Sequence, residues 1–115
     1  MRDAIEDLYN VILARKEGGD ANSYTAYLFR EGLDKILKKC GEECSEVIIA
    51  AKSLQAEPAT GRTDDLKNEL CDLLYHLLVL MAERDIPLAD IEAILAERAA
   101  KTGNLKQFKT VNKDS

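Results

Sequence analysis

The fold is decided by residues 70–81, which read LCDLLYHLLVLM. Every residue in this stretch is apolar or tyrosine except Asp72 and His76. A helix that is hydrophobic around its whole circumference must be covered on all sides, and not along one stripe only. We therefore predict that residues 70–81 form part of a helix that is buried nearly all round, at the core of a helical bundle.

A second long helix is predicted upstream, from residue 33 to about residue 55. Apolar side chains recur there with a period of about 3.6 residues, at Leu33, Ile36, Leu37, Cys40, Cys44, Val47, Ile48, Ala51 and Leu54. Residues 56–62 contain a proline and a glycine and break the pattern. Thr63 or Asp64 can then cap the next helix, which contains residues 70–81 and continues to about Arg84.

Three shorter helices are expected around this pair. Residues 3–16 carry one apolar stripe and precede two glycines, as at the end of a helix. Ser23 can cap a short helix that Gly32 interrupts. A last helix follows the break at 85–87, with its proline in the first turn, and Gly103 ends it. Because Ala, Leu, Glu and Lys also dominate the composition, the fold class is predicted to be all-α.

The length of 115 residues is typical of a single domain. We place an all-α domain over residues 1–100. The stretch 101–115 is rich in lysine and lacks helical periodicity, so we predict a mobile tail there.

The charge balance and the cysteines restrict the partners and the compartment. Sixteen basic against 21 acidic residues give a net charge of −5, which disfavours binding of nucleic acid. No apolar stretch approaches the roughly 20 residues that span a bilayer, and the acidic N-terminus does not resemble a signal peptide. Cys40, Cys44 and Cys71 lie within apolar helical patterns, which favours buried, reduced thiols. We expect a cytoplasmic protein without membrane or nucleic-acid partners.

Four carboxylates form the most informative pattern for function. Glu43 and Glu46 are three residues apart on one long helix, and Glu69 and Asp72 are three apart on the other. Residues with this spacing share a helix face, and a short connection favours antiparallel packing of the two helices. The four acids would then converge. Such a cluster needs cations to balance its charge, and ligands that are all oxygen favour Mg²⁺, with Mn²⁺ as a substitute.

Each of these residue types also has a structural interpretation. Acids on exposed helices are commonly solvated or paired with lysine, and we prefer that interpretation for Glu42 and Asp65. Asp72 is different, because a charged residue in an apolar run is rarely buried without a partner. His76 is interpreted as a core histidine with satisfied hydrogen bonds. The cysteines and His76 lack the spacings of a structural zinc site.

The sequence has no glycine-rich phosphate loop, so any bound nucleotide would be held by metal and lysines, and three lysines are candidates for contacting its phosphates. Lys39 falls on the same helical flank as Glu43 and Glu46, and Lys35 lies one turn before it. Lys52 is included as a third candidate, although it projects from another side of the helix. The alternative is that these lysines are solvated surface residues.

These motifs resemble a known family. Glu42-Glu43-x-x-Glu46 with Glu69-x-x-Asp72 resembles the acidic signature of the MazG-like all-α nucleotide pyrophosphohydrolases. The runs Ser23-Tyr24-Thr25-Ala26, Lys35-Ile36-x-Lys38-Lys39-x-Gly41, Ile49-Ala50-Ala51-Lys52 and Asp72 to Leu80 are similar to the phosphoribosyl-ATP pyrophosphohydrolase family. The resemblance extends from about Ile5 to Arg98. The family it points to catalyses the second step of histidine biosynthesis.

The resemblance implies a MazG-like helical bundle completed by dimerisation, with Mg²⁺ held by Glu43, Glu46, Glu69 and Asp72. The implied reaction is hydrolysis of N1-(5-phosphoribosyl)-ATP to phosphoribosyl-AMP and pyrophosphate. Two other hypotheses stay open at this point. One is a housecleaning pyrophosphatase that acts on other nucleoside triphosphates, and the other is a non-catalytic helical interaction module.

Overall fold

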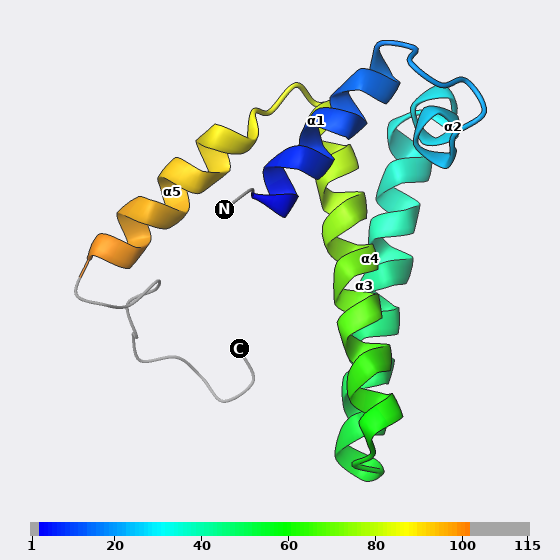
Figure 1. The fold of residues 1–115 in the computed structure, drawn as a ribbon, viewed down its shortest axis with the longest axis vertical. Coiled ribbons are helices and arrows are strands. Elements are labelled where there is room, and N and C mark those ends of the chain that lie inside the picture. The colour runs from blue at the N-terminus through cyan, green and yellow to red at the C-terminus, as the bar shows by residue number, and fades with distance from the viewer. Residues whose placement is uncertain (1–2, 102–115) are drawn as a thin grey trace.

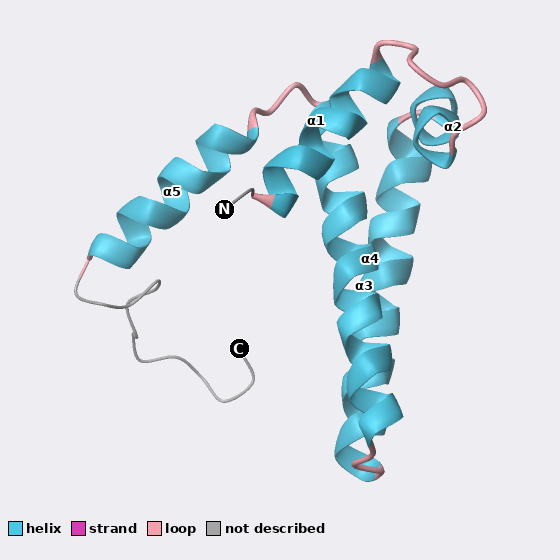
Figure 2. Ribbon diagram, viewed as in Figure 1, coloured by secondary structure: helices cyan, strands magenta, loops and turns pink. Residues whose placement is uncertain are grey.

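The computed structural model describes residues 3–101, and every element in this range is a helix (Figure 2). In chain order the elements are α1 (Ala4–Lys16), α2 (Tyr24–Glu31), α3 (Leu33–Ala56), α4 (Thr60–Glu83) and α5 (Leu88–Ala100). The all-α prediction is confirmed. The expectations for Gly103 and for the tail after Lys101 lie outside the described residues.

Helices α3 and α4 form a long antiparallel hairpin, as the short connection between them predicted (Figure 1). The predicted cap of α4 was wrong, because the helix begins at Thr60, ahead of Thr63 and Asp64. The backbone amides of Arg62 and Thr63 donate to the carbonyl oxygen of Ala59 at 3.0 and 3.4 Å. The first turn is therefore already closed by main-chain hydrogen bonds, and no side chain caps it.

The first two helices begin with side-chain caps, of which the one at Ser23 was predicted from the sequence. The Asp3 carboxylate accepts a hydrogen bond from the amide of Ile5 at 2.9 Å, and the Ser23 hydroxyl accepts one from the amide of Ala26 at 3.0 Å. Between α2 and α3 the chain turns at Gly32, whose φ of 95° lies in the left-handed region. A side chain there would strain the backbone, which explains why a glycine separates the two helices.

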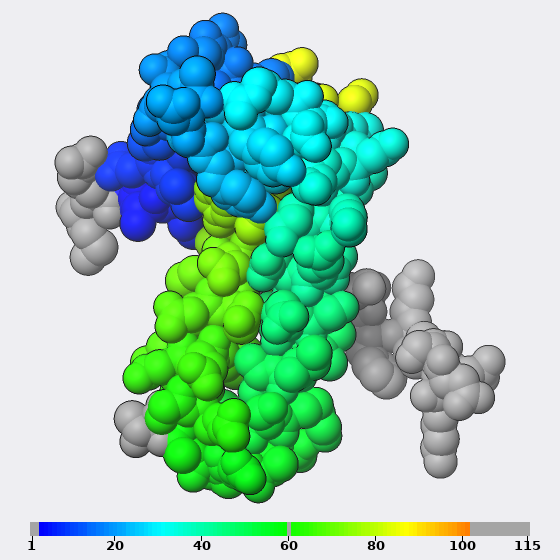
Figure 3. Space-filling view, turned by 90° about the vertical axis from the view of Figure 1, so that its right-hand side faces the viewer, coloured from blue at the N-terminus to red at the C-terminus, as the bar shows by residue number. Residues whose placement is uncertain are grey.

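The core lies where α1 and α2 cross one end of the hairpin (Figures 1 and 3). The buried side chains are Tyr9, Ile12, Leu28, Ile36, Leu78, Val79 and Ala82. The Tyr9 hydroxyl donates to the carbonyl oxygen of Ile86 at 2.5 Å, and the Lys16 ammonium pairs with the Asp85 carboxylate at 2.7 Å. These contacts fasten α1 to the end of α4.

The expectation that α4 is buried nearly all round is wrong for the chain by itself. Burial is concentrated between His76 and Ala82, close to α1 and α2. Leu70, Leu74 and Leu77 are exposed by 48%, 39% and 39%. Their spacing places them on one face of α4, which the described part of the chain leaves uncovered. This face is apolar, and no element of residues 3–101 covers it.

Helix α5 projects away from the hairpin (Figure 1). It has no buried residue, and Pro87 stands at its N-cap instead of in its first turn.

The prediction of buried thiols was also wrong in part, because Cys44 and Cys71 are exposed and only Cys40 is half-buried. All three thiols are free. Apolar periodicity identifies the face of a helix but not what covers it. No helix among residues 3–101 is long and apolar enough to cross a membrane.

Candidate active site

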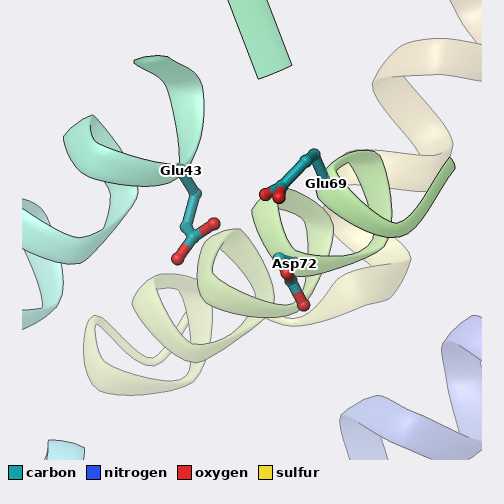
Figure 4. Close-up of side chains that lie close together, drawn as sticks. All are labelled: Glu43, Glu69 and Asp72. Atoms are coloured by element: carbon teal, nitrogen blue, oxygen red, sulfur yellow. The ribbon is translucent and has the colours of Figure 1, made fainter. Parts of the chain in front are cut away.

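Three of the four predicted acids lie together between the long helices (Figure 4). Glu43 comes from α3, whereas Glu69 and Asp72 come from successive turns of α4. One carboxylate oxygen of each residue lies within 4.8 Å of the others. We call Glu43, Glu69 and Asp72 the carboxylate group.

Glu46 lies beside the carboxylate group and is not a member of it. Its charge acts on Glu69, which shows that the two side chains are close. Glu46 and Glu69 also line a pocket of about 230 Å³ between α3 and α4, together with Arg62, Asp65, Asn68 and part of the apolar side of α3. Glu42 instead faces two lysines, with 3.0 Å from its carboxylate to the Lys39 ammonium. The structural interpretation of Glu42 as a solvated, paired acid is therefore confirmed.

Ionisation of Glu69 is disfavoured by its surroundings. Partial burial raises the pKa of this carboxyl above its usual range, and the charges of Asp72, Glu46, Glu43 and Asp65 raise it further. The folded chain holds several carboxylates close together. A cation bound among them would remove the repulsion that these charges cause.

The carboxylate group fits a hard divalent cation by the chemistry of its donors. Its ligand atoms are all carboxylate oxygens, which suit Mg²⁺ or Mn²⁺ better than Zn²⁺. Among residues 3–101 this is the one group of acidic, cysteine or histidine side chains close enough to share an ion. The cysteines and His76 are not members of this group.

We expect the variant Glu69→Gln to raise the melting temperature of the metal-free protein at pH 7. The folded-state pKa of Glu69 is raised, so its ionised form destabilises the fold above that pKa, and a neutral amide removes this cost. Thermal denaturation in a chelator measures the change. With Mg²⁺ added, the wild type should gain more stability than the variant. A lower metal-free melting temperature for Glu69→Gln would contradict the repulsion argument.

The three candidate lysines have different positions. Lys39 lies at the carboxylate group, with its ammonium 3.8 Å from the Glu43 carboxylate. Lys35 lies over the ring of Tyr27, 5.8 Å from the centroid. Lys52 is exposed and donates to the amide oxygen of Gln55 at 2.5 Å. The structure therefore brings Lys39 to the acids, and it leaves Lys52 outside the residues that line the nearby pocket.

His76 is buried, 5% exposed, and both of its ring nitrogens have partners. Nδ1 lies 2.7 Å from the carbonyl oxygen of Asp72, and Nε2 lies 3.1 Å from the hydroxyl of Tyr24. The interpretation of His76 as a satisfied core histidine is confirmed. The contact of Tyr24 with His76 and the place of Arg62 in the pocket beside Glu46 and Glu69 are features that the sequence analysis missed, because both depend on how separate helices pack.

The all-helical fold and the carboxylate group between two antiparallel helices are consistent with the class of MazG-like nucleotide pyrophosphohydrolases. The family model described as phosphoribosyl-ATP pyrophosphohydrolase matches residues 5–99. A protein named phosphoribosyl-ATP pyrophosphatase from Clostridium novyi (strain NT) is 55% identical over 104 residues, which cover 90% of this chain and 88% of the relative.

Two further relatives carry the same name. The protein from Clostridium acetobutylicum is 50% identical over 105 residues, covering 91% of this chain and 89% of its own. The protein from Listeria innocua is 48% identical over 108 residues, covering 94% and 97%. This chain belongs to the phosphoribosyl-ATP pyrophosphohydrolase family.

Proposed function

We propose that this protein hydrolyses the α–β phosphoanhydride of N1-(5-phosphoribosyl)-ATP in a Mg²⁺-dependent reaction, which yields phosphoribosyl-AMP and pyrophosphate. This is the second step of histidine biosynthesis. The observation that carries the proposal is the carboxylate group, in a chain that belongs to this family. Family membership also sets aside the hypothesis of a non-catalytic interaction module.

Glu43, Glu69 and Asp72 would hold the cation, and Glu46 would complete the set from its place one turn further along α3. When bound, Mg²⁺ supplies charge neutralisation for the phosphates and lowers the pKa of a coordinated water. The chain's own contribution is to position the four carboxylates on two long helices that pack against each other. A carboxylate that does not ligate the ion can accept the proton of the attacking water.

Lys39 would contact substrate phosphates from its position 3.8 Å from Glu43. Lys35 lies one turn earlier on α3 and can provide a second positive charge for the phosphates. Lys52 is proposed as an outer contact only, because its ammonium is engaged with Gln55. Arg62 lines the pocket beside Glu46 and Glu69, and because its guanidinium pairs with Glu57 at 2.9 Å it is likewise proposed as an outer contact, for the leaving pyrophosphate.

Purified protein should be assayed with phosphoribosyl-ATP beside a panel that includes dCTP, dUTP and the other deoxynucleoside triphosphates. We expect hydrolysis of phosphoribosyl-ATP to be the most efficient by kcat/KM, with pyrophosphate as a product. Expression of the gene should also restore growth without histidine to a bacterium that lacks this activity. Preference for a deoxynucleoside triphosphate, without rescue of growth, would favour the housecleaning function instead.

The variants Lys35→Ala and Lys39→Ala are expected to raise KM by about tenfold, with a smaller change in kcat. A lysine that contacts phosphate as a point charge stabilises substrate and transition state alike. Affinity for Mg²⁺ without substrate should stay unchanged, or improve for Lys39→Ala, because a positive charge beside Glu43 is removed. Lys67→Ala is the control, since Lys67 pairs with Asp64 on an exposed face. Loss of Mg²⁺ binding without unfolding would show that the lysines support the acidic site structurally.

The apolar face of α4 favours a homodimer as the working form. Leu70, Leu74 and Leu77 line one face of the helix and are exposed within a single chain. Ile94 and Leu95 on the projecting helix α5 are exposed as well. Covering these side chains with a second copy would supply the burial that the sequence of residues 70–81 predicts. We also propose that the dimer works in the cytoplasm, on a small-molecule substrate and without membrane or nucleic-acid partners.

Sedimentation velocity at micromolar concentration is expected to give a dimer. The variant Leu74→Glu should shift the protein towards monomer, because it places a charge at the centre of the apolar face. Val11→Glu on α1, where the side chain is also about half exposed, is the matched control and should stay dimeric. A monomeric wild type under these conditions would contradict the proposed homodimer.

A further inference from the structure

An aromatic cluster lies next to the carboxylate group, and the proposed hydrolysis does not use it. The ring of Tyr24 stacks on Tyr27, with centroids 6.1 Å apart and an interplanar angle of 28°. Tyr75 lies 6.3 Å from Tyr24, and the imidazole of His76 meets the edge of the Tyr24 ring at 5.8 Å. Rings from α2 and α4 are therefore held together at one place.

Tyr24 differs from the other members of the cluster because it is accessible. Its side chain is 46% exposed, and it is the only aromatic residue among residues 3–101 that is exposed. A nucleobase binds proteins most readily by stacking on an accessible aromatic face. Among the described residues, Tyr24 is thus the one aromatic side chain that offers a substrate such a face.

Tyr24 is also close to the acids and to the lysine that faces them. Lys39 and Glu43 both act on the pKa of the Tyr24 hydroxyl, which burial raises more than any neighbouring charge does. The pocket that contains Arg62 lies on the other side, towards Glu46 and Ser53 on α3. Along α3 the acids therefore lie between an aromatic end at Tyr24 and a polar pocket at Arg62. The lining of that pocket contains no aromatic side chain.

His76 fixes the orientation of Tyr24. Nδ1 of His76 lies 2.7 Å from the carbonyl oxygen of Asp72, which can only accept, so Nδ1 carries the proton. In the neutral ring Nε2 is then an acceptor, and the Tyr24 hydroxyl donates a hydrogen bond to it, with 3.1 Å between the two atoms. Through the two bonds, one buried side chain ties Tyr24 of α2 to the turn of α4 that carries Asp72.

We propose that Tyr24 is the stacking surface for the nucleobase end of the substrate, and that His76 is a positioning residue which holds this ring beside the carboxylate group. The proposal rests on the proposed function. Phosphates at the acids place the nucleoside towards Tyr24 and the departing pyrophosphate towards the pocket of Arg62. The tyrosine would then distinguish nucleotides from inorganic polyphosphates.

The test compares Tyr24→Leu with wild type on two probes that share the phosphate chain. Phosphoribosyl-ATP has a base, whereas tripolyphosphate, used as a competitive inhibitor, has none. We expect Tyr24→Leu to raise KM by about tenfold and to change kcat by no more than about twofold. The inhibition constant of tripolyphosphate should stay unchanged. Val11→Ala, at a similarly exposed side chain on α1, should change none of these values.

The role of His76 is tested by its hydrogen bond to Tyr24. His76→Asn keeps a donor near the position of Nδ1 and loses the contact to the tyrosine, whereas His76→Gln keeps an amide near the position of Nε2. We expect His76→Asn and Tyr24→Phe each to raise KM about threefold, and the double variant to be no worse than either. His76→Gln should recover part of the wild-type KM. If the increases in KM of the two single variants add up in the double variant, the two residues act independently, and His76 does not position Tyr24.

The outcomes separate this inference from the proposed function. If wild type fails to hydrolyse phosphoribosyl-ATP, the proposed function is wrong. If wild type hydrolyses it and Tyr24→Leu keeps the wild-type KM, the stacking proposal is wrong. An equal loss of affinity for phosphoribosyl-ATP and for tripolyphosphate would also overturn it, because Tyr24 would then contact the phosphate chain and not the base. Thermal denaturation of each variant verifies that the protein is folded.

Discussion

The variant Asp72→Asn is expected to lower kcat for phosphoribosyl-ATP hydrolysis by at least about 100-fold. Asp72 lies with Glu43 and Glu69 where one cation can bind to all three. An amide keeps the shape of the side chain but provides no negative charge, so cation affinity and phosphate neutralisation decline together. The same loss is expected for Glu43→Gln, Glu46→Gln and Glu69→Gln.

The fold should survive each of these substitutions, because Asp72 is exposed and none of the four acids belongs to the buried core. Asp64→Asn is the matched control, since Asp64 is also an exposed aspartate of α4 but pairs with Lys67. Steady-state kinetics at saturating Mg²⁺ measures the effect, and circular dichroism verifies the helices. Wild-type rates in all four variants would show that the site has been assigned to the wrong residues.

Removal of divalent cations is expected to reduce hydrolysis to background, a loss of at least about 1,000-fold. The carboxylate group and Glu46 bring like-charged side chains together, with the Lys39 ammonium 3.8 Å from Glu43. Without a cation this surface repels a triphosphate. The chain should remain helical, since the buried core contains none of these acids.

Dialysis against a chelator followed by titration with single metals measures this dependence. Mg²⁺ should restore the activity and Mn²⁺ should substitute for it, because both accept oxygen ligands in octahedral geometry. Ca²⁺ is the control, as it binds carboxylates but tolerates looser geometry. Undiminished hydrolysis by the metal-free protein would contradict the proposed mechanism and leave the carboxylate group without a role.

The helices could be predicted from local patterns alone. The bounds of α1 agree with the apolar stripe over residues 3–16, and those of α2 and α3 agree with the cap at Ser23 and the glycine at residue 32. The start of α4 could not be predicted in this way, because main-chain bonds to Ala59 close its first turn without a side-chain cap. Side-chain capping is visible in a sequence, and closure by the backbone is not.

The acids of the site were equally visible in the sequence, since three-residue spacing on a helix is a local property. The sequence by itself determined that Glu43 and Glu46 share one face and that Glu69 and Asp72 share another. Only the tertiary structure decided that Glu43, Glu69 and Asp72 form one group and that Glu46 lies beside it. The reason is that helical periodicity sets angles around one axis, whereas the register between α3 and α4 depends on how their side chains pack. The contact of Tyr24 with His76, and the apolar face of α4 that the described helices leave uncovered, depend on packing in the same way.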